Sequence, residues 1–460
     1  MKTSKILHQL MVFAKAAFML ICFTSNRADA QYSHTIFWMQ HIPQAGYANV
    51  AMQPQPKWYI GMPALSSYHL GAANTGFAYR DMVSRDQFNE RVYDDNKLIR
   101  ALDNQNQLDL HFSAEWLAFG FAAGPAYVSF SLTEKIGGSF SYSDDFVALM
   151  LKGNGYFADQ NRPADLSGLG VNMYHYREFS AGYSRQLTDF LTAGVRGKFL
   201  FGMSNIWFEK SEFSVNTNPD SYTIRLETDF LVNTSLPFVI SPIEDGIDDI
   251  DVDPTDYLFN LDNPGFALDL GAVYNPTNNI TLAASIVDLG FIRWRSDTEN
   301  IAGTGGFDFE GLDLNNFFNN GDALDALLDS LENALSYTET TNHYRTTMNP
   351  YLFIAGKYEL TPAHSFGILS GVRILDDGFR HQLTISYNLK LSHIFGASLG
   401  YSVFGNNYAN LGGGFYLNAG PLQFYLVSDN FLGAMQPHRM QMTNARFGFN
   451  WVFGRKARDS

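Results

Sequence analysis

The chain has a single cysteine, Cys22, among its 460 residues, so it cannot form an intramolecular disulfide. After residue 30 it also lacks any stretch that approaches the roughly 18 uninterrupted apolar residues of a membrane helix. Positive charge is scarce: 31 Lys and Arg stand against 46 Asp and Glu, and the formal net charge of −15 argues against nucleic acid as a partner. Aromatic residues, by contrast, make up 15% of the chain. A membrane β-barrel explains both the missing helices and the aromatic content, because its strands alternate apolar with polar residues and carry aromatic girdles.

The N-terminus has the pattern of a secretory signal. A basic start and a largely apolar run precede an A-x-A cleavage site that ends at Ala30. The alternative is a lipoprotein anchored through Cys22, but that chemistry requires a small residue before the cysteine, and Ile21 is not small. We therefore predict a signal peptide over residues 1–30 and the cell outer membrane as the destination. The cysteine leaves with the signal, so the mature chain has no disulfide.

The last strand-like segment, Ala445 to Phe453, places aromatic residues on one face and Arg446, Gly448 and Asn450 on the other. Lipid-facing and lumen-facing side chains alternate in this way in outer-membrane barrels. A C-terminal aromatic strand is also the usual signal for the barrel insertion machinery, which we expect as a partner together with outer-membrane lipids and lipopolysaccharide. The predicted insertion signal consists of Phe447, Phe449, Trp451 and Phe453.

The same alternation recurs along the chain. From Phe379 to Lys390, five apolar residues alternate with polar ones, and comparable patterns cover Leu108 to Ala118, Leu191 to Met203 and Tyr222 to Val232. Ala118 and Met203 fall in the outward, apolar phase. About fourteen such segments, one of them 221–234, predict an all-β fold. It is a transmembrane antiparallel up-and-down barrel with a lumenal N-terminal segment and long outward loops. Short periplasmic turns are expected at segments such as Arg185 to Thr188.

The inward, polar phase of these strands supplies the predicted lumen. Charges of both signs there either form a salt network that seals the pore or a constriction that selects solutes, and the network is favoured because mixed-sign charges inside barrels commonly pair. The candidate lumen-lining residues are Asp109, Glu115, Arg196, Lys198, Arg225, Glu227, Asp229 and Arg380.

Three regions do not follow the strand pattern. Residues 31–106 are rich in Pro, Gln, Tyr and Gly, and we predict a lumenal plug there, with a disordered periplasmic segment as the alternative. The barrel is predicted over 107–454 and a short tail over 455–460. The acidic regions 238–263 and 300–337 are expected to form outward loops, and a short helix near Asp144 to Leu151 is expected to cap another loop.

Motifs that suggest chemistry are weak. Gly396 to Gly400 matches G-x-S-x-G, but Ser398 lies within an alternating segment and not at the strand-to-helix turn that a nucleophile elbow requires. The acidic run Asp249 to Asp253 resembles the start of a calcium loop, yet Pro254 stands where that loop needs glycine. The histidines show no metal-pair spacing. We therefore predict no catalytic residues, no metal, no cofactor and no enzymatic activity.

Several short motifs resemble an uncharacterised outer-membrane barrel family, a domain of unknown function found in bacteria with type IX secretion. They are Ile42-Pro43-Gln44, Gly61-Met62-Pro63-Ala64-Leu65, Asn74-Thr75-Gly76-Phe77, Met150-Leu151-Lys152-Gly153-Asn154-Gly155, Tyr176 to Tyr183 and Ser428 to Gly433. The resemblance covers essentially the whole mature chain. It implies a barrel broadly similar to long-chain fatty-acid transporter-like (FadL-like) and PorV-like barrels, and no established substrate.

The main functional hypothesis is a non-enzymatic accessory or structural subunit of an outer-membrane secretion or assembly complex, so further complex subunits are possible partners. The alternative is a FadL-like transporter or porin for hydrophobic or small solutes.

Overall fold

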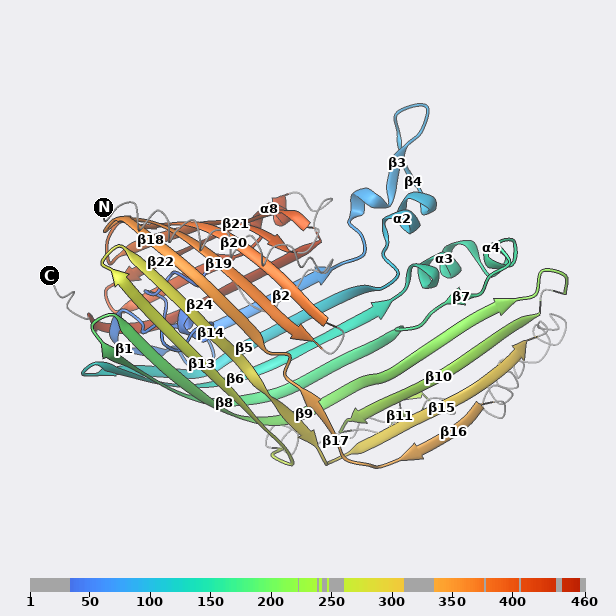
Figure 1. Ribbon diagram of the computed structural model, residues 1–460, viewed down its shortest axis with the longest axis horizontal. Coiled ribbons are helices and arrows are strands. Elements are labelled where there is room, and N and C mark those ends of the chain that lie inside the picture. The colour runs from blue at the N-terminus through green and yellow to red at the C-terminus, as the bar shows by residue number, and fades with distance from the viewer. Residues whose placement is uncertain are drawn as a thin grey trace.

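The computed structural model describes residues 34–221, 223–237, 240–241, 246–247, 260–309, 335–375, 378–404, 407–435 and 441–455. The predicted signal peptide, the acidic run 249–253 and most of the predicted tail lie outside these residues. The described chain forms one closed antiparallel barrel of fourteen strands (Figure 1), as predicted.

Closure of the ring depends on an early, interrupted strand. Its two halves, β1 (Pro56–Gly61) and β2 (Ser67–Asn74), each pair with β5 (Asn106–Ala123) on one side and β24 (Met442–Arg455) on the other. From β5 the ring continues through β6 (Ala126–Tyr142), β8 (Gly170–Thr188), β9 (Leu191–Thr217), β13 (Asn263–Thr277), β14 (Ile280–Trp294), β18 (Tyr351–Thr361), β19 (His364–Leu375), β20 (Gly378–Lys390), β21 (Phe395–Phe404), β22 (Asn407–Ala419) and β23 (Leu422–Ser428) to β24.

The strand count is right, but two of the predicted assignments are wrong. The barrel begins at Pro56 and not at residue 107, because β1 and β2 belong to the wall. The predicted wall strand 221–234 corresponds to β10 (Ile224–Ser235), which is not a separate strand of the ring. One edge of β9 pairs with β13 along its first, proximal half and with β10 along its second, distal half. One wall strand, formed by β1 and β2, was not predicted, and one predicted wall strand, β10, is not in the ring, so the total of fourteen is still right.

A curved sheet extends from one end of the barrel (Figure 1). It consists of the distal half of β9 with β7 (Ala164–Asp165), β10, β15 (Thr298–Phe309) and β16 (Leu335–Thr340), and β17 (Tyr344–Thr347) connects it to β18. We call these strands the extension. The acidic region predicted as a loop over 300–337 therefore contains strand at both of its ends, and residues 310–334 lie outside the described residues.

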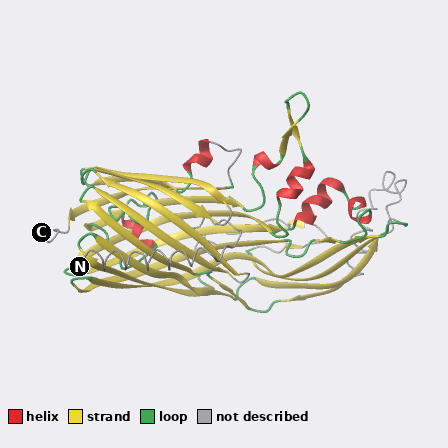
Figure 2. Cartoon of the chain, turned by 45° about the horizontal axis from the view of Figure 1, so that its top comes forward, coloured by secondary structure: helices red, strands yellow, loops and turns green. Residues whose placement is uncertain are grey.

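Helices gather at the same end as the extension (Figure 2). They are α2 (Asp95–Ala101), α3 (Asp144–Lys152) and α4 (Gly155–Ala158), next to the 3-10 turn η2 (Tyr79–Asp81) and the projecting hairpin β3 (Val83–Arg85) and β4 (Arg91–Tyr93). The remaining short elements are β11 (Ile240–Ser241), β12 (Gly246–Ile247) and α8 (Phe431–Met435). Helix α3, at the predicted position, begins where the Ser143 hydroxyl accepts a hydrogen bond from the Phe146 N–H at 3.0 Å. Within the described ranges, no helix is both long and apolar enough to cross a membrane.

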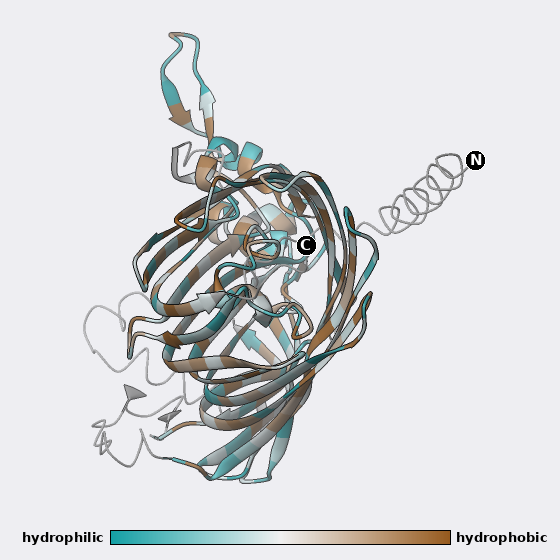
Figure 3. Ribbon diagram, turned by 90° about the vertical axis from the view of Figure 1, so that its left-hand side faces the viewer, coloured by the Kyte–Doolittle hydropathy of each residue, from teal (hydrophilic) through white to brown (hydrophobic). Residues whose placement is uncertain are grey.

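Two-residue connections join β5 to β6, β8 to β9, β13 to β14, β18 to β19 and β22 to β23 at the end opposite the extension. Short turns thus lie next to the predicted positions: Arg185 to Thr188 are the last residues of β8, and the turn itself is residues 189–190. Strand alternation is also visible as apolar and polar bands along the wall (Figure 3). On β20 the predicted phase holds throughout: Phe379 and Ile385 are exposed, whereas Arg380 and Gln382 are buried.

Bulges overturn the predicted phase at two positions. The register of β5 against β6 shifts between Glu115 and Leu117, so Ala118 points inward and packs with Tyr59 and Tyr127. On β9 the register shifts beside Met203, which is 2% exposed instead of facing outward. An extra residue in one strand moves every later side chain of that strand to the opposite face. The alternation of the sequence alone does not show where the extra residue lies.

Residues 34–55 lie inside the ring and supply much of its apolar core. Phe37 and Met52 pack with Tyr351 and Phe353 of β18, and Ile42 packs with β22 and β23. A 3-10 turn, η1 (Pro43–Tyr47), occupies the middle of this segment. We call residues 34–55 the lumenal segment.

Candidate functional site

The lumenal segment is fixed to the wall at its centre by a buried hydrogen-bond hub around Glu115 of β5. The Gln44 amide donates to Glu115 Oε1 at 3.0 Å, to Ser66 Oγ at 3.2 Å and to Asn450 Oδ1 at 3.0 Å. Asn450 returns a hydrogen bond to Gln44 Oε1 at 3.0 Å. The hydroxyls of Tyr47 and Ser66 donate to the two Glu115 oxygens. We call these five residues the latch.

Further contacts hold both ends of the lumenal segment. At its start, the backbone N–H groups of His34 and Thr35 donate to the Asp429 carboxylate at 3.0 and 2.7 Å. Near its end, the Asn49 amide donates to backbone carbonyls of β13 and β14, and the Ser285 hydroxyl donates to the Ala48 carbonyl at 2.6 Å. Irregular backbone at membrane depth requires such partners, because bulk water is not there to replace them.

A charged cluster lies beside the latch, with Lys198 of β9 at its centre. Its ammonium is 2.9 Å from Asp269 Oδ1, 2.5 Å from Asp288 Oδ1 and 4.0 Å from Glu178 Oε1. Arg196 contacts Asp269 Oδ2 at 3.2 Å and donates to the Gly46 carbonyl at 3.0 Å, so the cluster also touches the lumenal segment. A bulge aims Asp288 inward: its φ is 59°, and the strand register shifts at this point. Buried charges are tolerated because cations and carboxylates alternate.

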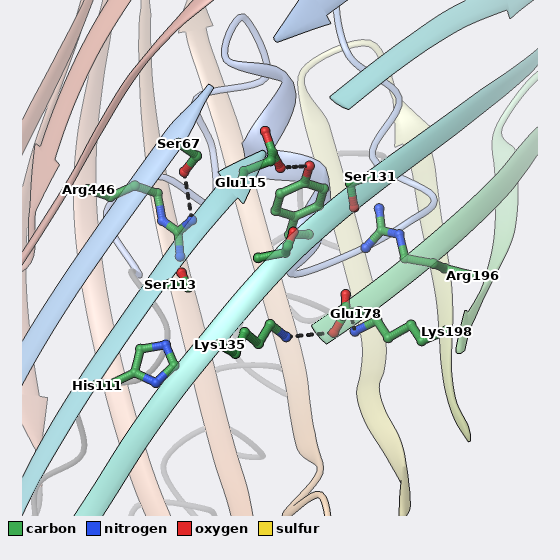
Figure 4. A pocket seen from close by; sticks show the side chains of 12 residues that line it. Ser67, His111, Ser113, Glu115, Ser131, Lys135, Glu178, Arg196, Lys198 and Arg446 are labelled. Carbon is green, nitrogen blue, oxygen red and sulfur yellow. Dashed lines mark hydrogen bonds and ion pairs between the residues drawn. The ribbon is translucent and has the colours of Figure 1, made fainter. Parts of the chain in front are cut away.

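Between the latch and the charged cluster is a polar cavity (Figure 4). Tyr47, Glu115, Lys135, Arg196 and Arg446 are among the residues that line it, and its free space is about 50 Å³. That volume accommodates one or a few water molecules but not a typical organic ligand, which occupies sites of roughly 300 Å³ or more.

Of the predicted lumen-lining residues, five lie in the lumen. Arg196 and Lys198 share the charged cluster and Glu115 belongs to the latch. Arg380 Nη1 of β20 lies 3.7 Å from Asp109 Oδ2 of β5, although these two strands are not neighbours in the ring. The contact between Arg380 and Asp109 crosses the lumen, and it lies closer to the extension than the latch and the charged cluster do.

The prediction is wrong for the other three residues, which lie on β10 and do not line the lumen. Arg225 pairs with Glu227 at 2.9 Å and with Asp308 of β15 at 3.1 Å, and Asp229 pairs with Lys210. Side-chain exposures of 39–59% for Arg225, Glu227 and Asp229 place them on the solvated extension. An extension strand alternates for the same reason as a wall strand, so its pattern does not reveal which of the two it is.

Two kinds of residue in the site were not predicted from the sequence. Asp269 and Glu178 occupy inward positions of predicted strands, so the alternation that selected Lys198 pointed to them as well. Gln44 and Tyr47 lie in a segment without periodicity, and no sequence signal assigns them to Glu115.

The residues of the predicted insertion signal all lie on the outward face of β24. Phe447 stacks on Tyr68 with ring centroids 5.6 Å apart, Phe449 contacts Phe424 at 5.1 Å, and Phe453 is 45% exposed. Their role in insertion stays a prediction.

Ser398 of the G-x-S-x-G motif is buried inside β21 and donates to Asn388 Oδ1 at 2.8 Å. No group of three or more His, Cys, Asp or Glu side chains suited to a metal ion occurs in the described part of the chain.

The fold and lumen define a class: a closed transmembrane β-barrel with its own N-terminal segment inside. The chain belongs to a family of unknown function (DUF5723), whose sequence profile matches residues 51–429. The predicted membership of an uncharacterised family is thus confirmed, whereas the link to type IX secretion stays a prediction. No curated protein matches the chain.

Solved structures with a similar fold include a FadL homologue from Pseudomonas aeruginosa, with 11% identity and a TM-score of 0.46 over 94% of this chain and 100% of that chain. The toluene transporter TodX from Pseudomonas putida has 9% identity and a TM-score of 0.39 over 93% and 95%. The toluene transporter TbuX from Ralstonia pickettii has 8% identity and a TM-score of 0.39 over 90% and 93%.

Proposed function

We propose that this protein is an outer-membrane transport barrel for small solutes, kept closed by the lumenal segment and opened when the latch releases. The apolar outer face of the wall supports a membrane location. The observation that carries the transport proposal is the way the lumen is closed: a separate segment fills it and is held at its centre by hydrogen bonds.

Hydrogen bonds of this kind are suited to a reversible closure. Each contributes a net of about 1 kcal/mol, or about 1.5–3 kcal/mol when one partner is charged, because water competes for the same groups. The latch can therefore exchange its partners for water once the lumen hydrates. The free space of about 50 Å³ beside the latch is too small for solute passage, so transport requires that the lumenal segment move.

Flux through proteoliposomes tests the proposal. The double variant Gln44→Ala/Tyr47→Phe removes the donors of the lumenal segment to Glu115, and we expect it to admit small sugars and amino acids faster than the wild type does. The matched control is Gln87→Ala, at an exposed position of the projecting hairpin. Equal flux for both variants and the wild type would reject a latch-controlled conduit.

The accessory-subunit hypothesis is the second candidate, and the β3–β4 hairpin favours it. Phe88 at the hairpin tip is 75% exposed, and the hairpin projects away from the wall (Figure 1). An exposed aromatic residue on a projecting arm suits contact with another protein. Copurification in mild detergent tests this: partners that are retained by the wild type and lost by Phe88→Ser would favour the accessory role.

A further inference from the structure

Four cationic side chains are among the residues that line the polar cavity beside the latch: Lys135, Arg196, Lys198 and Arg446. Arg446 of β24 and Arg196 of β9 enter it from opposite sides (Figure 4). Arg196 is neutralised by Asp269, whereas Arg446 has no carboxylate within 4.0 Å among the described residues and donates to the Ser67 hydroxyl at 3.1 Å. We propose that this cavity binds a small monovalent anion of halide size, with Arg446 as its principal ligand. This goes beyond the transport function and does not depend on it.

The two carboxylates that line the cavity, Glu115 and Glu178, already have partners other than Arg446. Both oxygens of Glu115 accept hydrogen bonds within the latch. Glu178 Oε2 accepts from Lys135 at 2.7 Å, and its Oε1 faces Lys198. Toward the cavity remain the other guanidinium N–H groups of Arg446 and the ammonium of Lys135, together with hydroxyls such as that of Ser113, which can donate or accept. N–H donors of two cationic side chains that converge on one small cavity favour an anion.

A second observation concerns the neighbour of Arg446 in the wall. His69 of β2 lies in register between Arg446 of β24 and Ser113 of β5. Its side chain is completely buried, and neither ring nitrogen has a hydrogen-bond partner among the described residues. A buried polar ring in this state is costly unless an unseen group compensates for it. One of the two nitrogens of the neutral ring carries a hydrogen, and this N–H is a further donor next to Arg446 in the strand register.

The size of the cavity restricts the ligand. Its free space of about 50 Å³ admits a dehydrated halide ion with a water molecule, but excludes a bulky organic anion such as gluconate. Because the ligand would lie between the latch and the charged cluster, its binding stabilises the closed arrangement of the lumen by mass action.

Thermal unfolding of the full mature chain in detergent tests this inference. Sodium chloride or bromide replaces sodium gluconate at constant ionic strength, so that general screening stays the same. We expect the melting temperature of the wild type to rise and then saturate as either halide increases. Arg446→Gln should lose the rise, whereas Arg225→Gln, on the exposed extension, should retain it.

Crystals of the wild-type protein grown in bromide give an independent readout that does not depend on the folding of a variant. We expect an anomalous bromide peak within hydrogen-bond distance of the Arg446 guanidinium. Water alone in the cavity, with no bromide peak there, would overturn the inference. An equal halide response in the wild type and Arg446→Gln would do the same.

Discussion

Replacement of Lys198 by methionine is the substitution that should destabilise the barrel wall most clearly. Lys198 is 3% exposed and lies within 4.0 Å of three carboxylates, two of them at 2.9 Å or less. Methionine keeps much of the apolar stem but removes the charge, so Asp288 loses this cation and Asp269 keeps only Arg196 in its place. Removing one partner from a buried ion pair costs about 3–5 kcal/mol, because the charge left behind stays buried.

A cost of about 3–5 kcal/mol shifts the unfolding equilibrium constant by roughly two to almost four powers of ten, because each power of ten corresponds to about 1.4 kcal/mol. Urea unfolding of the protein reconstituted in lipid vesicles, followed by tryptophan fluorescence and by heat-modifiable gel migration, measures the shift. The matched control is Lys210→Met, whose partner Asp229 is also charged but whose side chain is 42% exposed. Exposed pairs of this kind contribute at most about 1 kcal/mol.

A double variant separates electrostatics from packing. Lys198→Met/Asp269→Asn removes one charge of each sign, so its destabilisation should be smaller than the sum of the two single effects. If Lys198→Met and Lys210→Met lower stability equally, or if the double variant is simply additive, the buried cluster does not hold the lumen together as described.

Two further predictions concern the outer face and the lumen. The double variant Trp451→Asp/Phe453→Asp should accumulate less in the membrane and give more periplasmic degradation products, because the outward face of the last strand would carry charge. The control Phe88→Asp, on the projecting hairpin, should leave the amount of protein in the membrane unchanged. Gly271→Val should displace the lumenal segment, because a Cβ at this position would lie 2.2 Å from Asn49 Oδ1. Gly197→Val is the control and should leave the segment in place, because nothing lies within 4 Å of a Cβ there. Faster proteolysis of the lumenal segment in Gly271→Val than in Gly197→Val measures the difference, and equal rates would contradict the assigned contact.

Alternation predicted most of the wall, because each wall strand separates lipid from a polar lumen and the two environments impose opposite side chains. It worked best where a strand is continuous, as from Phe379 to Lys390. It failed for β1 and β2, which are short and separated by Met62 to Ser66, so neither half is long enough to show the period. It also failed to place β10, since pairing with the distal half of β9 instead of the proximal half leaves no trace in the sequence of β10.

The candidate site was only partly predictable. Arg196, Lys198 and Glu115 were found as inward charges on alternating strands, but their partners depend on register, on the bulge at Asp288 and on the course of the lumenal segment. These features arise from contacts between residues far apart in the chain, such as Gln44 with Asn450. A single sequence contains the groups that make such contacts but does not specify which groups meet.

The most direct test of the central claim is the conductance of single barrels in planar lipid bilayers. The deletion should remove residues 34–53 and stop before Pro56, because β1 and β2 belong to the wall and a longer deletion would open the ring. The chain without its predicted signal peptide should be silent, and the deletion should give steady, stepwise conductance. Removal of the external hairpin over residues 83–93 should leave the barrel silent. If the full chain already conducts like an open porin and the deletion changes nothing, the lumenal segment does not close the barrel.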